Sequence, residues 1–141
     1  MKVVLTARIN PSEDPDKVKR AVLNLTDPRD SLVVQITKDE VRIEGGELTV
    51  RRIIQAVKDK DMTVLMLSLL NEGKKNDKYY LMFNKQAAFV GHLVMCDDPQ
   101  ESPLGPITVE FDTEAIKLIL SEVKIARDRR SRTPAEQEQQ F

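Results

Sequence analysis

Hydrophobic and polar positions alternate along several short segments of the chain. In the first of them, Lys2–Ile9, the apolar side chains Val3, Leu5, Ala7 and Ile9 share one face. A repeat of two residues predicts a β-strand. Similar apolar runs bounded by turn residues predict five more strands, at Leu32–Thr37, Val41–Glu44, Tyr79–Phe83, Phe89–Met95 and Ile107–Phe111. The second and third of the six predicted strands form a hairpin around Lys38-Asp39-Glu40.

Apolar residues spaced three and four apart predict four helices. Each helix carries a capping or glycine signal at one end: Asp14-Pro15 starts the first, Gly45-Gly46 precedes the second, Gly73 ends the third and Asp112-Thr113 starts the last. In the third helix the run Val64–Leu70 is apolar on nearly all sides. We therefore expect this helix to be the most buried.

The predicted order is strand, helix, two strands, two helices, three strands, helix. Because the strands come in runs and do not alternate strictly with helices, we expect an α+β domain with a mixed or largely antiparallel sheet and helices packed on one face. Residues 1–127 form this single domain. The segment Asp128–Phe141 has only Ala135 and Phe141 as clearly apolar residues, which predicts a charged, flexible C-terminal tail.

Composition and charge narrow the classes of protein. The chain has 141 residues, 22 basic and 23 acidic side chains and a net charge of −1, which excludes a protein that is basic overall. The single cysteine, Cys96, excludes an internal disulfide framework and fits a reducing compartment. No apolar run approaches the roughly 18 residues that span a bilayer. We expect a cytoplasmic protein that makes no membrane contact.

Catalytic chemistry has weak support in the sequence. His92 lies in the predicted strand Phe89–Met95, and Cys96 follows four residues later. In a strand this spacing puts both side chains on the same face, where they could form a Cys–His dyad. Structural roles fit these two residues better, because no clustered histidine, cysteine or carboxylate partner accompanies them. No phosphate-binding, nucleophile-elbow or zinc-protease motif is present. We therefore expect no catalytic residues, no cofactor and no metal. An enzyme that uses His92 and Cys96 ranks third, after the two non-catalytic hypotheses given below.

Two polar stretches interrupt the apolar pattern, Asn84–Gly91 and Glu101–Ile107. Amide and ammonium groups can bind bases and phosphates, and a phenyl ring can stack on a base. The candidate contacts to RNA or another partner are Asn84, Lys85, Gln86, Phe89, Ser102 and Gly105. The structural alternative is a water-facing hairpin tip beside a proline-braced loop, and composition alone favours it. Basic clusters at Lys17/Lys19/Arg20, Arg51/Arg52 and Arg127–Arg132 add a weak signal.

Three separated motifs, Ala7–Pro15, Asn84–Gly91 and Glu101–Ile107, together resemble an uncharacterised family of small archaeal proteins. That family is grouped with predicted RNA-binding, exosome-associated proteins and has the fold of the large-subunit ribosomal protein that contacts 5S rRNA. The resemblance implies a two-layer α+β sandwich and RNA binding. The leading hypothesis is a non-catalytic RNA-binding accessory protein. The alternative is a homo-oligomeric protein-interaction module, such as a homodimer, without nucleic acid.

Overall fold

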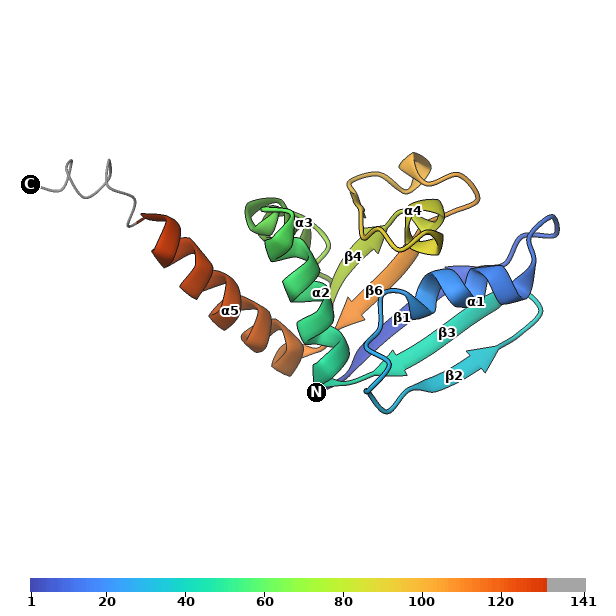
Figure 1. The fold of residues 1–141 in the computed structure, drawn as a ribbon, viewed down its shortest axis with the longest axis horizontal. Helices are drawn as coiled ribbons and strands as arrows, with labels where there is room; N and C mark the ends of the chain where they lie inside the picture. The colour runs from blue at the N-terminus through green and yellow to red at the C-terminus, as the bar shows by residue number, and fades with distance from the viewer. Residues whose placement is uncertain (132–141) are drawn as a thin grey trace, which may run out of the picture.

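Six strands form one antiparallel sheet (Figure 1). The computed structural model describes the backbone of residues 1–131 and the side chains of residues 1–123. The strands are β1 (Val3–Arg8), β2 (Val33–Ile36), β3 (Glu40–Gly45), β4 (Tyr79–Phe83), β5 (Met95–Cys96) and β6 (Ile107–Phe111). Their order across the sheet is β2-β3-β1-β6-β4-β5, so β2 and β5 are the edge strands. The helices are α1 (Pro15–Leu23), α2 (Glu47–Asp59), α3 (Thr63–Glu72), α4 (Lys85–Phe89) and α5 (Thr113–Ser131).

The core lies between one face of the sheet and the helices. Ile43, Leu5 and Val109 occupy one row across neighbouring strands and are fully buried. The next row on the opposite face contains Arg42, Thr6 and Thr108, which are only partly buried. This alternation is typical of an antiparallel sheet covered on one side. The prediction of an α+β domain with helices on one face of the sheet is confirmed.

Local capping chemistry explains where the first and last helices begin. The carboxylate of Asp14 accepts the backbone N–H of Asp16 at 3.0 Å, directly before α1. The carboxylate of Asp112 accepts the backbone N–H of Ala115 at 2.8 Å at the start of α5. A carboxylate at these positions satisfies an N–H that has no partner within the helix. Both sequence-predicted caps are confirmed.

The predicted strand Phe89–Met95 is wrong. Residues Lys85–Phe89 form α4, and only Met95–Cys96 pair with β4 as a strand. Asn84 decides the outcome, because its side chain accepts the backbone N–H of Ala87 at 2.8 Å and caps the helix. Gly91, at a φ of 89°, then takes the left-handed conformation that turns the chain away from the helix. The polar stretch is therefore a capped helix and not a hairpin tip.

The sequence predicts α3 as the most buried helix, but its apolar run is covered on one side only. Met66, Leu69 and Leu70 are buried, but Val64 on the outer side is 64% exposed. The helix packs on β4 and has only a small contact with α2, so its outer side is left uncovered. An apolar run on all sides of a helix does not by itself ensure a covering element.

The last helix extends past the predicted domain boundary. α5 continues to Ser131 and runs away from the sheet (Figure 1). The start of the predicted tail 128–141 is therefore helical, and residues 132–141 of it lie outside the described residues. No helix within residues 1–131 is long and apolar enough to cross a bilayer.

Candidate functional site

The three motifs singled out in the sequence meet around one buried lysine. Lys85, the first residue of α4, is only 3% exposed. Its Nζ donates to the carbonyl oxygen of Arg8 at 2.8 Å and to that of Leu104 at 2.9 Å. It also lies 3.1 Å from the nearer carboxylate oxygen of Glu13. One ammonium group thus ties together the end of β1, the loop before α1 and the loop before β6.

Glu13 is the charged partner that makes this burial tolerable. Burial alone would raise the pKa of its carboxyl, but hydrogen bonds from Asn10 and Lys85 outweigh burial and lower the pKa below its ordinary value of 4.5. The Asn10 side-chain amide donates to Glu13 at 2.7 Å and to the carbonyl oxygen of Leu104 at 2.7 Å. The carboxylate therefore stays ionised at neutral pH, and its negative charge balances the positive charge of the Lys85 ammonium.

Ser102 fixes the other side of α4. It is 2% exposed, and its Oγ accepts the backbone N–H of Lys85 at 3.1 Å. The same oxygen lies 3.1 Å from the side-chain carbonyl of Gln86 and 3.0 Å from the backbone carbonyl of Gly105. The Gln86 amide nitrogen donates to the carbonyl oxygen of Pro103 at 2.7 Å. The loop Ser102–Pro106 and α4 therefore hold each other in place.

A groove of about 320 Å³ runs between α1 and α4 on the outer side of this network. Its lining residues are Ser12, Glu13, Asp14, Lys17, Val18, Ala21, Lys85, Gln86 and Phe89. Lys17 and Gln86 are exposed on opposite walls, and Phe89 is half-buried. The guanidinium carbon of Arg20 lies 5.3 Å from the centre of the Phe89 ring, within the range of a cation–π contact. The groove thus combines the exposed Lys17 with the carboxylates of Glu13 and Asp14, the Gln86 amide and the aromatic ring of Phe89.

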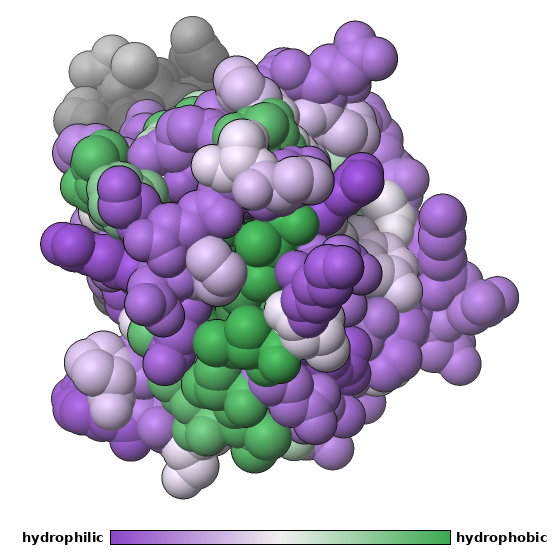
Figure 2. Space-filling view, turned by 90° about the vertical axis from the view of Figure 1, so that its right-hand side faces the viewer, coloured by the Kyte–Doolittle hydropathy of each residue, from purple (hydrophilic) through white to green (hydrophobic). Residues whose placement is uncertain are grey.

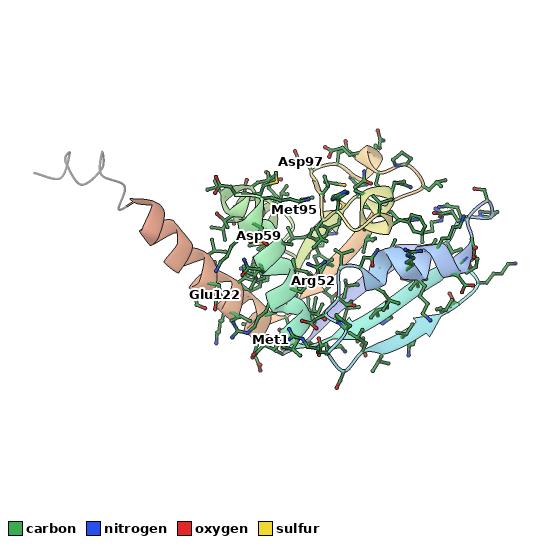
Figure 3. The ribbon with its side chains drawn as sticks, in the orientation of Figure 1. Met1, Arg52, Asp59, Met95, Asp97 and Glu122 are labelled. Atoms are coloured by element: carbon green, nitrogen blue, oxygen red, sulfur yellow. The ribbon has the colours of Figure 1, made fainter. Side chains whose placement is uncertain are left out.

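Contacts behind the groove fix α1 against α4. The Asn24 side-chain amide donates to the carbonyl oxygen of Ala88 at 2.8 Å. Arg52 of α2 donates in turn to the carbonyl oxygen of Asn24 at 3.1 Å (Figure 3 labels Arg52). The two helices that form the groove are therefore fixed relative to each other and to α2.

The sequence-predicted contact residues have different positions around this site. Gln86 and Phe89 line the groove with polar and aromatic surface. Lys85 borders it too, but its three N–H donors already have the three partners described above. The Asn84 side chain caps α4 and contacts the carbonyl oxygen of Glu101 at 3.4 Å.

Gly105 borders a second groove, on the side where Arg8 lies.

Some residues of the candidate site are missed or only weakly indicated by the sequence. The partnership of Glu13 with Lys85 spans 72 residues, and no local pattern reveals it. Lys17 and Arg20 belong to a basic cluster that the sequence does indicate, and only the fold places that cluster beside Phe89.

His92 and Cys96 do not share a strand face. His92 is exposed in the turn after α4, whereas Cys96 is buried in β5 opposite Met82. Burial, with a smaller contribution from Glu101, raises the pKa of the Cys96 thiol, so the reactive thiolate is disfavoured at neutral pH. Within the described part of the chain, no three His, Cys, Asp or Glu residues are placed to hold a metal ion.

The chain is similar to several archaeal proteins and to solved structures of archaeal proteins. A UPF0201 protein of Metallosphaera sedula is 35% identical over 119 residues, covering 82% of this chain and 83% of the relative. A UPF0201 protein of Methanopyrus kandleri is 35% identical over 121 residues, covering 80% and 76%. The crystal structure of a UPF0201 protein from Methanococcus jannaschii superposes with a TM-score of 0.64 at 25% identity, covering 86% of this chain and 91% of that one.

A family model described as RNA binding matches residues 2–113, which include α1, α4 and all three motifs. The archaeal family named by the relatives is uncharacterised, in agreement with the resemblance of the three motifs. The chain belongs to this UPF0201 family, whose model carries the description RNA binding.

Proposed function

We propose that this protein binds single-stranded RNA in the groove between α1 and α4. The observation that carries the proposal is the convergence of Lys17, Gln86 and the Arg20–Phe89 pair on one groove. The family model's description as RNA binding supports the same function. Single strands are favoured over duplexes because a base must be unstacked before it can lie on an aromatic ring.

Each groove residue has a defined task in this proposal. Lys17 and Arg20 lie on the exposed side of α1 and attract phosphates. The Arg20 guanidinium lies over the Phe89 ring. A base can therefore stack on the outer face of this guanidinium, or on the Phe89 ring once the Arg20 side chain moves aside. Gln86 can donate to or accept from a base edge if its amide releases the carbonyl oxygen of Pro103.

Lys85 is a positioning residue in this account. It has no free N–H for a phosphate, but it holds α4 and the loop Ser102–Pro106 against the start of α1. A site held in place before binding loses less conformational entropy when the ligand arrives. The network therefore favours a groove that is formed in the free protein.

The role we propose is non-catalytic. The exposed His92 and the buried Cys96 belong to different segments, and neither lines the groove. Association with exosome-related proteins and likeness to the 5S rRNA-contacting ribosomal protein stay predictions drawn from the resemblance.

Titration of a fluorescent, mixed-sequence single-stranded RNA at several salt concentrations tests the proposal. For Lys17→Ala we expect weaker binding and a slope of log affinity against log salt that is smaller by ~0.7, the effect of one phosphate contact. For Phe89→Leu we expect a loss of about 1–3 kcal/mol from stacking, with the salt slope unchanged.

Arg51→Ala is the matched control. Arg51 lies on α2, where it contacts Glu47 and Glu122 at 3.2 Å each, and it is absent from the groove lining. Its removal should leave RNA affinity and the salt slope unchanged. Equal losses for Lys17→Ala and Arg51→Ala, or no RNA binding even at low salt, would contradict the proposal.

A further inference from the structure

The edge strand β2 presents apolar side chains to solvent on both faces. Val33, Val34 and Ile36 are 53%, 39% and 44% exposed. Val34 and Ile36 stand opposite the buried Ile43 and Val41 of β3, so they lie on the helix-covered face but beyond the helices. The side of the molecule on which β2 and α1 lie shows a strip of hydrophobic residues among polar ones (Figure 2).

The hydrogen-bond pattern of the hairpin shows which backbone groups of β2 remain unpaired within the sheet. The backbone N–H of Thr37 donates to the backbone carbonyl oxygen of Glu40 at 2.9 Å, so this N–H points toward β3. Along an antiparallel strand, the backbone N–H and C=O groups of successive residues point alternately to one side of the strand and to the other. The backbone N–H and C=O groups of Gln35 and Val33 therefore also point toward β3. Those of Val34 and Ile36 point to the free edge.

Apart from its short length of four residues, this edge lacks the features that usually prevent strand pairing. Exposed edges are commonly protected by charged side chains, proline, a bulge or a covering loop. β2 reads Val-Val-Gln-Ile, with no charge, proline or glycine, and its pairing with β3 is regular over all four residues. Such an edge is suited to the addition of another strand.

We propose that β2 is the interface of a homodimer, in which a second copy of this chain pairs its own β2 antiparallel to the first. A two-fold axis passes beside Gln35, so that Gln35 faces Gln35 of the second copy and Val34 faces Ile36. Val34 and Ile36 of each copy then supply the four backbone hydrogen bonds that the free edge allows. The two sheets become one continuous sheet.

A second copy fits this edge because the register is self-complementary. The two-fold axis places the apolar Val34 and Ile36 against each other on one face. On the other face Gln35 meets its own copy, and Val33 meets Thr37. Opposite positions from Ser31 to Asp39 bring no two like charges together. The next pair, Asp30 opposite Glu40, lies outside β2, and the Asp30 carboxylate there accepts the backbone N–H groups of Gly46 and Thr49.

The expected dimer is weak. A strand of four residues buries less surface than the ~1,600 Å² of a standard stable interface, so we expect association in the micromolar range of Kd. Because the paired residues are uncharged, the dimer should not weaken as salt rises, in contrast to RNA binding.

Sedimentation equilibrium of the full chain over a concentration series measures the dimer. The apparent mass should rise from 16.1 kDa toward twice that value for the wild type. Val34→Lys places a charge at the edge and should hold the protein at the monomer mass. Val64→Lys, at the exposed Val64 of α3, should dimerise as the wild type does.

A cysteine tests the register itself. Gln35 and its copy form a non-hydrogen-bonded antiparallel pair, whose Cα atoms lie about 4.5 Å apart, within the range that a disulfide spans. Gln35→Cys should therefore give a covalent dimer under mild oxidation. Val33→Cys, one position from Val34 on the same edge but facing Thr37 of the second copy, should not. The native Cys96 is buried.

Each of three results would overturn the proposal of a dimer through β2 in this register. A wild type that stays monomeric up to high micromolar concentration excludes the dimer. A dimer that resists Val34→Lys but is lost with Val64→Lys places the interface on α3. Equal crosslinking of Gln35→Cys and Val33→Cys excludes the register. If Val34→Lys fails to fold by circular dichroism, Val34→Pro replaces it, because proline there removes only an N–H that points away from β3.

Discussion

Lys85 is a charged side chain whose whole donor capacity is used inside the protein. Its ammonium has two carbonyl oxygens and one carboxylate within 3.1 Å, which matches the three N–H bonds of a lysine. Taking both charges of such a pair out of water is costly, so the pair gains stability only when its hydrogen bonds are complete. Removing one member leaves the other charge buried without a partner.

We therefore expect Lys85→Met to lower the free energy of unfolding by ~3–5 kcal/mol, because the Glu13 carboxylate and two carbonyl oxygens lose their partner. Urea denaturation measures the change. Lys17→Met, on the exposed side of the same groove, is the control and should stay within about 0.5 kcal/mol of the wild type. A similar small effect for both variants would show that the Lys85 network contributes nothing to stability.

The pH dependence of stability should reveal Glu13. Its folded-state pKa is lowered below the ordinary value of 4.5, so the unfolded chain binds more protons in the interval between the two pKa values. The stability contributed by Glu13 is then complete above about pH 4.5 and is lost as pH falls through the folded pKa.

Glu13→Gln should therefore lose stability less steeply below pH 4.5 than the wild type does. Denaturant unfolding at each pH measures the free energy of unfolding of both proteins. Glu40→Gln, at an exposed position, should follow the wild-type curve. A wild-type slope in Glu13→Gln would mean that Glu13 has the same pKa in both states.

At the scale of elements, α4 is short and depends on its cap. We expect Asn84→Ala to cost about 1 kcal/mol, the usual value of an N-cap side chain, because the backbone N–H of Ala87 loses its acceptor. Asn84→Asp keeps an acceptor at the cap and should lose much less. Thermal unfolding of the two variants gives the comparison, and equal stabilities would contradict the capping role.

The sequence predicts most elements because their signals are local. The alternation along β1, the Asp14-Pro15 cap and the hairpin between β2 and β3 depend on neighbouring residues alone. The failure at Phe89–Met95 has a physical cause: a short apolar run fits both a strand and a buried helix end, and the cap at Asn84 decides between them.

The candidate site was predictable only in part. The polar stretch around Lys85 and Gln86 stands out in the sequence and does border the groove. The burial of Lys85 depends on Glu13, 72 residues away, and on a carbonyl oxygen of the loop before β6. Such a tertiary network leaves no local pattern, so sequence reasoning could not separate the residues that face the groove from those that support it.

At the scale of the whole molecule, a net charge of −1 means that attraction to RNA must come from a local cluster and not from the protein's overall field. The segment 128–141 carries several arginines but little apolar surface. We expect its deletion to lower the melting temperature by no more than a few degrees. A larger decrease, measured by circular dichroism, would show that the segment packs against the domain.

Ultraviolet crosslinking of bound single-stranded RNA, with the crosslinked peptides identified by mass spectrometry, tests RNA binding at the α1–α4 groove most directly. We expect crosslinks to the peptide that contains Phe89, with loss of this crosslink in Phe89→Leu. Tyr80 is an internal control, because it lies on the uncovered face of the sheet, where its hydroxyl contacts Glu110 at 3.0 Å. Crosslinks centred on Tyr80, with none at Phe89, would place RNA on the open face of the sheet and contradict RNA binding at the α1–α4 groove.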